Sequence, residues 1–245
     1  MSTLAENLSR LEDSIAAACR AANRRRNEVE LMAVSKTFPA ETILEAASLD
    51  LKLFGENRVQ EWANKSLEIR PKSKCTECRC NLIGHLQSNK AARAAELFDG
   101  IDSLDSLRLA ERLNEAAAKL GKRLPVLIEV KLSTEETKAG IDPASPETEQ
   151  LLEALPHLTS LETRGLMTIA PWGAPDEVTR ACFRNLRQWR DRWAQAFPRL
   201  NLDVLSMGMS GDFPLAIAEG ATRIRVGTAL FGKRPKPAPA DQDGP

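Results

Sequence analysis

The stretch "LMAVSKTFP" at residues 31–39 is a run of mostly apolar residues that reaches a lysine near its far end. In an extended strand, Met32 and Val34 share one face with Lys36. An apolar run of this kind is typical of a parallel strand that helices enclose on both sides. We therefore predict a buried parallel strand that places an amine at its carboxyl end.

Seven further short runs of strand-forming residues follow along the chain, and helical patterns separate them. The predicted strands lie within residues 29–36, 51–57, 81–86, 100–105, 125–132, 163–170, 202–209 and 222–229. The predicted helices lie within residues 39–48, 59–69, 89–98, 106–121, 146–158, 175–197 and 213–220. Strict alternation of strand and helix favours a parallel sheet, and eight units in 245 residues favour closure. The predicted fold is an α/β protein with a single (β/α)8 TIM barrel.

The two ends of the chain lie outside this repeating pattern. Thr3 and Glu6 match a capping box, so residues 3–22 are predicted to form an extra amphipathic helix before the first strand. Residues 234–245 are rich in proline and poor in apolar residues, which predicts a disordered tail. We expect residues 1–233 to form one domain.

Composition excludes several classes of protein. Thirty-four basic residues balance thirty-four acidic ones, so we expect no nucleic-acid partner. No apolar stretch is long enough to span a membrane, and the first residues do not resemble a signal peptide. We expect a cytoplasmic protein that is a monomer.

Three of the five cysteines are Cys75, Cys78 and Cys80. A structural zinc site normally takes four ligands, and this cluster offers three, so we predict no metal site. We expect a surface loop with reduced thiols, since disulfides are rare in a reducing compartment. The role of this cluster is open.

Polar residues gather at the predicted carboxyl ends of the strands, where the active face of such a barrel lies. A lysine near a desolvated barrel mouth tends towards a lowered pKa, which favours a nucleophilic amine that can form a Schiff base. The alternative is a lysine that extends to solvent. The polar residues are Lys36, Glu56, Asn57, His85, Gln87, Ser88, Asn89, Lys131, Thr168, Ser210 and Arg225.

The loops after the last two strands predict a phosphate site. Ser210 and Gly211 precede a predicted helix, and Gly227 and Thr228 precede another helical turn. Backbone N–H groups at helix starts bind anions, and these two loops form the recurrent phosphate site of this barrel. An aldehyde-capturing Lys36 beside a phosphate site indicates one ligand, pyridoxal 5′-phosphate (PLP).

Arg225, late in the last strand, has two interpretations. If alternation turns it inward, its permanent cation faces the ligand and can meet the pyridine nitrogen. That would weaken the electron sink on which most PLP enzymes depend. The alternative is an ion pair with a carboxylate such as Glu56 or Glu129.

These residues, in this order, resemble the pyridoxal-phosphate homeostasis protein family, whose fold is similar to the barrel domain of alanine racemase. The resemblance covers residues 4–233. It rests on "AVSKT" at 33–37, "FGENRVQE" at 54–61, "IGHLQSNK" at 83–90, "RGLMTI" at 164–169, "LSMGMSGD" at 205–212 and "IRVGTALFG" at 224–232.

The resemblance implies a role for each site residue. Lys36 would be the Schiff-base lysine, Asn57 would lie beside the cofactor ring, and Arg225 would approach the pyridine nitrogen. The phosphate would be held by Ser210, Gly227 and Thr228, with Met209 in the neighbouring wall.

One departure from the family pattern is visible. The family usually has tryptophan and histidine where this chain has Cys80 and Asn81. Both positions enter the third strand from its amino end, so we expect altered packing there and an intact cofactor site.

The resemblance implies a protein that binds PLP without established catalysis, keeps the free cofactor at usable levels and passes it to apo-enzymes. The alternative is an amino-acid racemase, in which His85 or Lys131 would supply the second acid or base. Alanine racemase uses a tyrosine and a second domain for this, and the chain has no tyrosine. A scaffold that senses the cofactor and contacts other proteins is a third interpretation.

Overall fold

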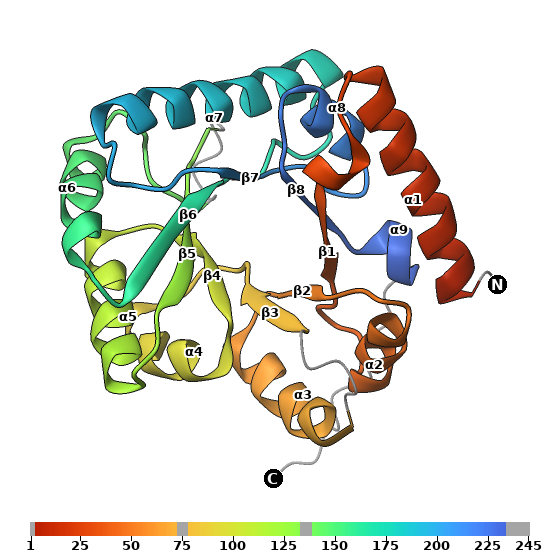
Figure 1. Cartoon of the computed structure of the whole chain (residues 1–245), viewed down its shortest axis with the longest axis horizontal. Coiled ribbons are helices and arrows are strands. Elements are labelled where there is room, and N and C mark those ends of the chain that lie inside the picture. Colours follow the sequence, from red (N-terminus) through yellow and green to blue (C-terminus); the bar gives the residue numbers. More distant parts are fainter. Residues whose placement is uncertain (1–2, 73–77, 133–138, 234–245) are drawn as a thin grey trace, which may run out of the picture.

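The computed structural model describes residues 3–72, 78–132 and 139–233 of the chain. Within them, eight parallel strands form a closed barrel in chain order, with β8 paired to β1 (Figure 1). This confirms the predicted barrel. The predicted tail at residues 234–245 lies outside the described residues and stays a prediction. The strands are β1 (Glu30–Val34), β2 (Leu53–Glu56), β3 (Arg79–Leu82), β4 (Gly100–Leu104), β5 (Leu124–Glu129), β6 (Leu161–Met167), β7 (Val204–Ser206) and β8 (Arg223–Val226).

Helices form an outer ring around the strands (Figure 1). No helix in the described part of the chain is long and apolar enough to cross a membrane. The helices are α1 (Leu4–Ala21), α2 (Ala40–Ser48), α3 (Val59–Lys72), α4 (Ala91–Leu97), α5 (Leu107–Lys119), α6 (Pro146–Ala154), α7 (Asp176–Ala196), α8 (Phe213–Ala218) and α9 (Thr228–Phe231), with short 3-10 turns η1 (Arg26–Glu28), η2 (Ser88–Lys90) and η3 (Leu155–His157). The helix predicted over 146–158 ends early, because Pro156 lacks an N–H and the chain tightens into η3.

The extra N-terminal helix is present as α1. The Thr3 hydroxyl accepts a hydrogen bond from the Glu6 backbone N–H, and the Thr3 N–H donates to the Glu6 carboxylate. This capping box satisfies two N–H groups that have no partner inside the helix. Leu11 and Ile15 are buried, and α1 lies beside α8 and α9 (Figure 1).

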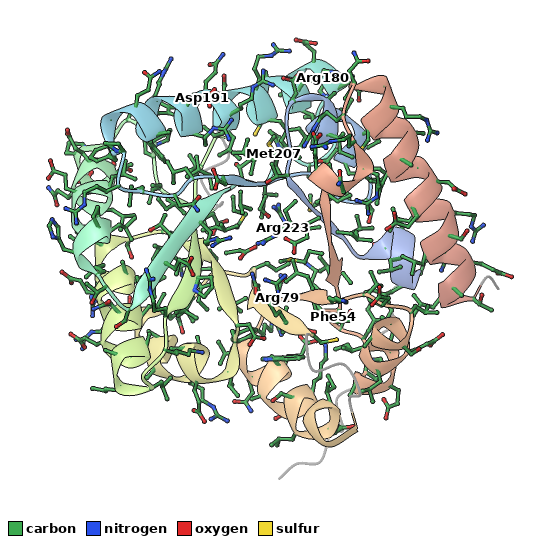
Figure 2. The ribbon with its side chains drawn as sticks, in the orientation of Figure 1. Phe54, Arg79, Arg180, Asp191, Met207 and Arg223 are labelled. Atoms are coloured by element: carbon green, nitrogen blue, oxygen red, sulfur yellow. The ribbon has the colours of Figure 1, made fainter. Side chains whose placement is uncertain are left out.

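Strand alternation divides the interior of the protein into two layers. Side chains such as Ala33 and Phe54 belong to the continuous apolar core between the strands and the helices. Residues on the opposite face, such as Met32 and Arg223, point into the barrel, and Figure 2 shows Arg223 near its centre. A polar side chain on an inward position is therefore enclosed by all eight strands.

A buried polar cluster forms the floor of the barrel. Arg223 Nε donates to Glu30 Oε2 at 2.8 Å, and its Nη1 donates to Asp102 Oδ2 at 3.0 Å. Asn81 Nδ2 donates to Asp102 Oδ1 at 2.8 Å. Asn81, the third of the four residues of β3, thus belongs to this floor cluster.

Candidate functional site

Lys36 lies two residues beyond β1, in the turn that leads to α2. The residue is half-buried, and Met32 and Val34 precede it on the inward face of the strand. A Cβ added to Gly55 of β2 would lie 2.8 Å from Met32 Sδ, so the inward layer is packed tightly below the lysine. Lys36 is therefore at the carboxyl rim of the barrel, where the sequence predicted it.

Gly227 brings the end of β8 against β1. Val226 pairs with Ala33, and a Cβ on Gly227 would lie 3.2 Å from the Val34 carbonyl oxygen. A side chain at this position would be tight against backbone. Glycine therefore lets the start of α9 lie beside the end of β1, the strand that precedes Lys36.

The loops after β7 and β8 meet at the start of α9. The Ser210 hydroxyl accepts a hydrogen bond from the Ala229 backbone N–H at 3.2 Å. Thr228 is the first residue of α9 and is exposed, whereas Ser210 and Gly227 are half-buried. The structure thus brings together the three residues predicted to hold a phosphate.

An aspartate that the sequence interpretation overlooked shapes the first of these loops. Asp212 accepts a hydrogen bond from the Met209 backbone N–H, and the Met209 carbonyl accepts from the N–H groups of Asp212 and Phe213. Gly208, with φ of +92°, turns the chain before Met209. Burial raises the pKa of Asp212. Its position at the N-cap of α8 was the available signal.

Arg225 points into the barrel and is 4% exposed. Its Nη1 donates to the Ser206 carbonyl and hydroxyl at 2.7 and 2.9 Å, and its Nη2 donates to the Thr168 carbonyl at 2.8 Å. Burial lowers its pKa, yet a guanidinium stays charged at neutral pH. A held cation therefore faces the interior from β8.

The alternative prediction for Arg225 was an ion pair with Glu56 or Glu129. The pairing with Glu56 is wrong. Glu56 lies on the outer face of β2, where its Oε1 accepts from Lys65 Nζ at 2.8 Å. Glu129 is electrostatically coupled to Arg225, but the hydrogen bonds of Arg225 in the described structure go to carbonyl and hydroxyl oxygens. Strand alternation explains the difference, because Glu56 shares its face with Phe54.

Glu129, which the sequence offered only as a partner for Arg225, has an environment that the sequence did not predict. It is 5% exposed, and its Oε2 has no hydrogen-bond partner among the described residues. Because β5 and β8 are not neighbours, Glu129 and Arg225 interact electrostatically across the barrel interior. Burial, and then the charge of Asp105, raises the pKa of Glu129 from 4.5 to about 7. Its inward register in β5 was the signal that could have predicted this burial.

Asn57 lies directly after β2, half-buried, and packs against the end of β3. A Cβ added to Gly84 would lie 2.3 Å from the Asn57 carbonyl oxygen and 2.9 Å from its Cα. Gly84 therefore determines where the Asn57 backbone lies.

Several other predicted polar residues lie away from these groups. His85, the candidate second acid or base, is exposed, and its Nδ1 is 2.9 Å from Asp105 Oδ2. Thr168 uses its hydroxyl to donate to the Val130 carbonyl at 2.8 Å. Lys131 is half-buried after β5.

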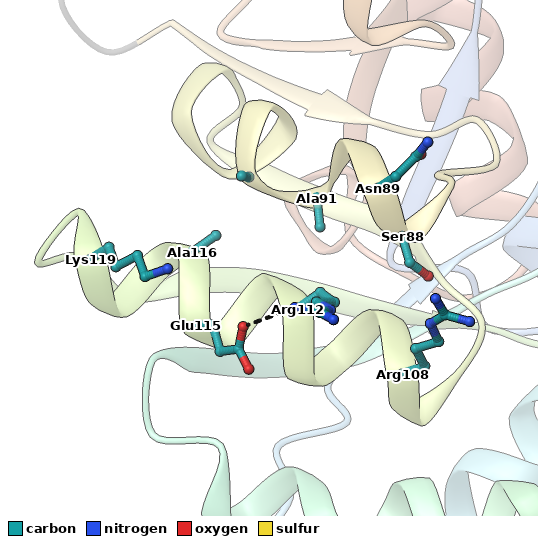
Figure 3. A pocket seen from close by; sticks show the side chains of 9 residues that line it. Ser88, Asn89, Ala91, Arg108, Arg112, Glu115, Ala116 and Lys119 are labelled. Carbon is teal, nitrogen blue, oxygen red and sulfur yellow. Dashed lines mark hydrogen bonds and ion pairs between the residues drawn. The ribbon is translucent and has the colours of Figure 1, made fainter.

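Ser88 and Asn89 line a groove between α4 and α5 on the outside of the barrel (Figure 3). The groove has a volume of about 320 Å³, and its wall on α5 includes Arg108 and Arg112. Arg112 faces Glu115 across a 3.4 Å ion pair. None of the predicted cofactor residues lines this groove.

The cysteine cluster differs from the expected reduced loop. Cys78 is disulfide-bonded, whereas Cys80 is a buried free thiol whose pKa burial raises well above its usual value. Whether two cysteines pair depends on how close their Cα atoms come in the folded chain, which cysteine spacing does not show, and this explains the error for Cys78. Cys75 lies outside the described residues. Within the described ranges, no group of three or more metal-ligating side chains is present.

The rim therefore combines three kinds of functional group. Lys36, a half-buried residue at the rim, supplies an amine, Ser210 and Thr228 supply hydroxyls near the start of α9, and Arg225 supplies an inward cation. This set suits a ligand with an aldehyde, a phosphate and an aromatic nitrogen.

Similar proteins carry the same fold over nearly the whole chain. The family model described as "Alanine racemase, N-terminal domain" matches residues 7–235. Solved alanine racemase from Clostridium difficile has a TM-score of 0.69 at 17% identity, covering 96% of this chain and 57% of that chain. At that identity the likeness concerns the fold alone.

Relatives with higher identity are named for homeostasis and not for a reaction. The "Pyridoxal phosphate homeostasis protein" of Haemophilus influenzae is 41% identical, covering 93% of this chain and 94% of that protein. That of Escherichia coli K12 is 40% identical, covering 96% and 98%. PipY of Synechococcus elongatus, solved with PLP bound, is 43% identical with a TM-score of 0.83, covering 94% of this chain and all of that one. The barrel described above thus belongs to the alanine racemase N-terminal-domain family and, within it, to the pyridoxal phosphate homeostasis proteins.

Proposed function

We propose that this protein binds pyridoxal 5′-phosphate and takes part in PLP homeostasis by holding the cofactor as a reversible Schiff base on Lys36. The observation that supports this best is the meeting of two loops at the rim: Gly227 lies against Val34, two residues before the half-buried Lys36, and Ser210 is bonded to the first turn of α9. The names of the relatives, and the PLP bound to PipY, agree with the same ligand.

Each predicted residue has a task in this proposal. The cofactor would supply an aldehyde, which condenses with the Lys36 amine to a C=N bond with loss of one water. Ser210, Gly227 and Thr228 would bind the phosphate through hydroxyl and N–H groups. Arg225 would present its cation to the pyridine nitrogen, and Asn57 and Met209 would line the ring.

The proposed function is not that of an enzyme. A racemase of the alanine type needs a second acid or base on the opposite face of the substrate carbon. The chain contains no tyrosine, and it spans 57% of the length of the solved alanine racemase. Racemase activity measured with purified protein and alanine should be at background level. The cytoplasmic location and monomeric state stay predictions from the sequence.

The proposed ligand can be tested by absorption and covalent trapping. We expect added PLP to produce a Schiff-base absorption band, and borohydride reduction followed by peptide mass mapping to find the adduct on Lys36. A Lys36→Ala variant should show neither. A wild-type protein with no adduct, or with the adduct on another lysine only, would contradict the proposal.

Gly84 gives a second test, because its backbone contact determines the position of Asn57. A Gly84→Ala methyl would overlap the Asn57 carbonyl, and relieving that overlap shifts the residue beside the ring. Overpacking costs about 1–3 kcal/mol of folding stability, so the backbone has to shift to relieve it. We expect this shift to weaken PLP binding by about 1.4 kcal/mol, which is about tenfold in affinity. Fluorescence titration with PLP measures this. An unchanged affinity in a folded variant would show that Asn57 does not contribute to binding.

We propose further that the protein passes PLP to apo-enzymes. A site at the open rim of the barrel suits reversible exchange. Loaded protein should reactivate an apo-enzyme faster than an equal concentration of free PLP, and the Lys36→Ala variant should lose the advantage. Equal rates from the protein and from free PLP would contradict transfer while leaving the binding proposal intact.

A further inference from the structure

A buried charge cluster lies on the outer face of β2, directly behind the turn that carries Lys36. Lys65 of α3 has a side chain that is 10% exposed, and Glu56 of β2 is fully buried. Lys65 Nζ donates to Glu56 Oε1 at 2.8 Å and to Glu61 Oε1 at 2.7 Å. Burying Lys65 and Glu56, beside a Glu61 side chain that is only partly exposed, is costly, so this cluster requires a reason beyond simple packing.

The bonds of the cluster converge on the two residues that flank Lys36. Lys65 Nζ donates its third hydrogen bond to the Ser35 carbonyl at 3.0 Å. The Ser35 hydroxyl donates to Glu56 Oε1 at 2.7 Å, and the Thr37 backbone N–H donates to Glu61 Oε1. The backbone on both sides of Lys36 is therefore tied to one ammonium group and its two carboxylates.

The turn needs this support because its backbone conformation is unfavourable. Thr37 has a φ of +69°, a left-handed conformation that is rare for a β-branched residue. Such a conformation persists only where the surroundings determine it. The Thr37 N–H donates to Glu61, and Lys65 holds Glu61 in place, so these two hydrogen bonds stabilise the conformation of Thr37.

We propose that Lys65, with Glu56 and Glu61, is a positioning residue for Lys36, which orients the amine for covalent capture of PLP. This inference rests on the proposed function of Lys36. The cluster lies on the outer face of β2, whereas the cofactor site is at the rim and in the interior, so Lys65 acts through the 35–37 backbone.

The test separates covalent capture from non-covalent binding. In Lys65→Met, the rate of Schiff-base formation with PLP, followed by stopped-flow absorbance, should fall at least about tenfold, since misplacement by 1 Å can cost about a hundredfold. Affinity for pyridoxine 5′-phosphate, which has the ring and phosphate but no aldehyde, should change less than about twofold. An equal loss for both ligands, or an unchanged capture rate, would overturn the positioning role.

Two further variants keep the test decisive. Lys119→Met makes the same change on an exposed residue of α5. It should change neither the rate of Schiff-base formation with PLP nor the affinity for pyridoxine 5′-phosphate. If Lys65→Met does not fold, Glu61→Ala removes the acceptor of the Thr37 N–H at a side chain that is 24% exposed. This variant should form the Schiff base with PLP more slowly and should keep its affinity for pyridoxine 5′-phosphate. An unchanged rate of Schiff-base formation would overturn the inference. A wild-type protein that forms no adduct on Lys36 would instead contradict the proposed function.

Discussion

Replacing Asp102 with alanine should lower the free energy of unfolding by about 3–5 kcal/mol, because it leaves a buried arginine without its inner carboxylate. Asp102 is 1% exposed and accepts hydrogen bonds from both Arg223 and Asn81 in the barrel floor. Glu30 would remain as a partner of Arg223, but it lies at the more exposed side of the cluster. Urea unfolding followed by circular dichroism measures the loss.

A charge-free floor should recover much of this stability. Asp102→Leu combined with Arg223→Met removes both buried charges, and apolar replacements of a buried ion pair are often neutral or stabilising. Asp13→Ala, an exposed aspartate of α1, is the matched control and should change stability by less than about 0.5 kcal/mol. If Asp102→Ala costs no more than this control, the floor cluster does not stabilise the barrel.

The Glu129→Gln variant should gain stability over the wild type as the pH rises. Glu129 has a pKa of about 7 in the folded protein against 4.5 as its ordinary value, so the folded state binds the proton more tightly. Between these two values the folded state holds more protons than the unfolded state, and wild-type stability falls as pH increases. The difference of 2.5 pKa units (7 − 4.5) corresponds to about 3 kcal/mol.

The measurement compares the two proteins at several pH values. Between pH 4.5 and pH 8, the stability of Glu129→Gln relative to wild type should rise by about 3 kcal/mol, with most of the rise between pH 4.5 and pH 7. Glu153→Gln in α6 changes an exposed glutamate and should follow the wild-type curve. Parallel curves for Glu129→Gln and wild type would mean that Glu129 titrates normally.

The proton on Glu129 also bears on the proposed cofactor site. A neutral Glu129 leaves the cation of Arg225 without a full countercharge from β5, whereas an ionised Glu129 offsets it. Near neutral pH, the protonation of Glu129 therefore changes the charge around Arg225, to which Asp102 and Asp212 also contribute.

Much of the architecture followed from local pattern. Apolar runs such as 31–35 can be stable only as enclosed strands, and their alternation with helices leaves few arrangements other than a closed parallel barrel. The capping box of Thr3 and Glu6 depends on residues three apart, so sequence alone predicted it correctly. The details that failed were local exceptions, such as the early end of α6 before Pro156.

The residues at the rim were predictable for the same reason. All strands of a parallel barrel end at one rim, so Lys36, Ser210 and Gly227 had to lie on the same side of the molecule once eight strands were assigned. Order along the chain could not give their separations, because those depend on how the barrel closes. The hydrogen bond from Ala229 to Ser210 joins two loops that only the β7–β8 neighbourhood brings together.

The sequence by itself thus determined the barrel, the rim and the residue types that point to PLP, because these depend on short-range periodicity and on the shared direction of the strands. Only the tertiary structure decided which face Glu56 takes, which carboxylates surround Lys65, and that Glu129 is buried without a partner for Oε2. Those properties depend on groups far apart in the chain, since burial and neighbouring charges set the protonation and pairing of a side chain.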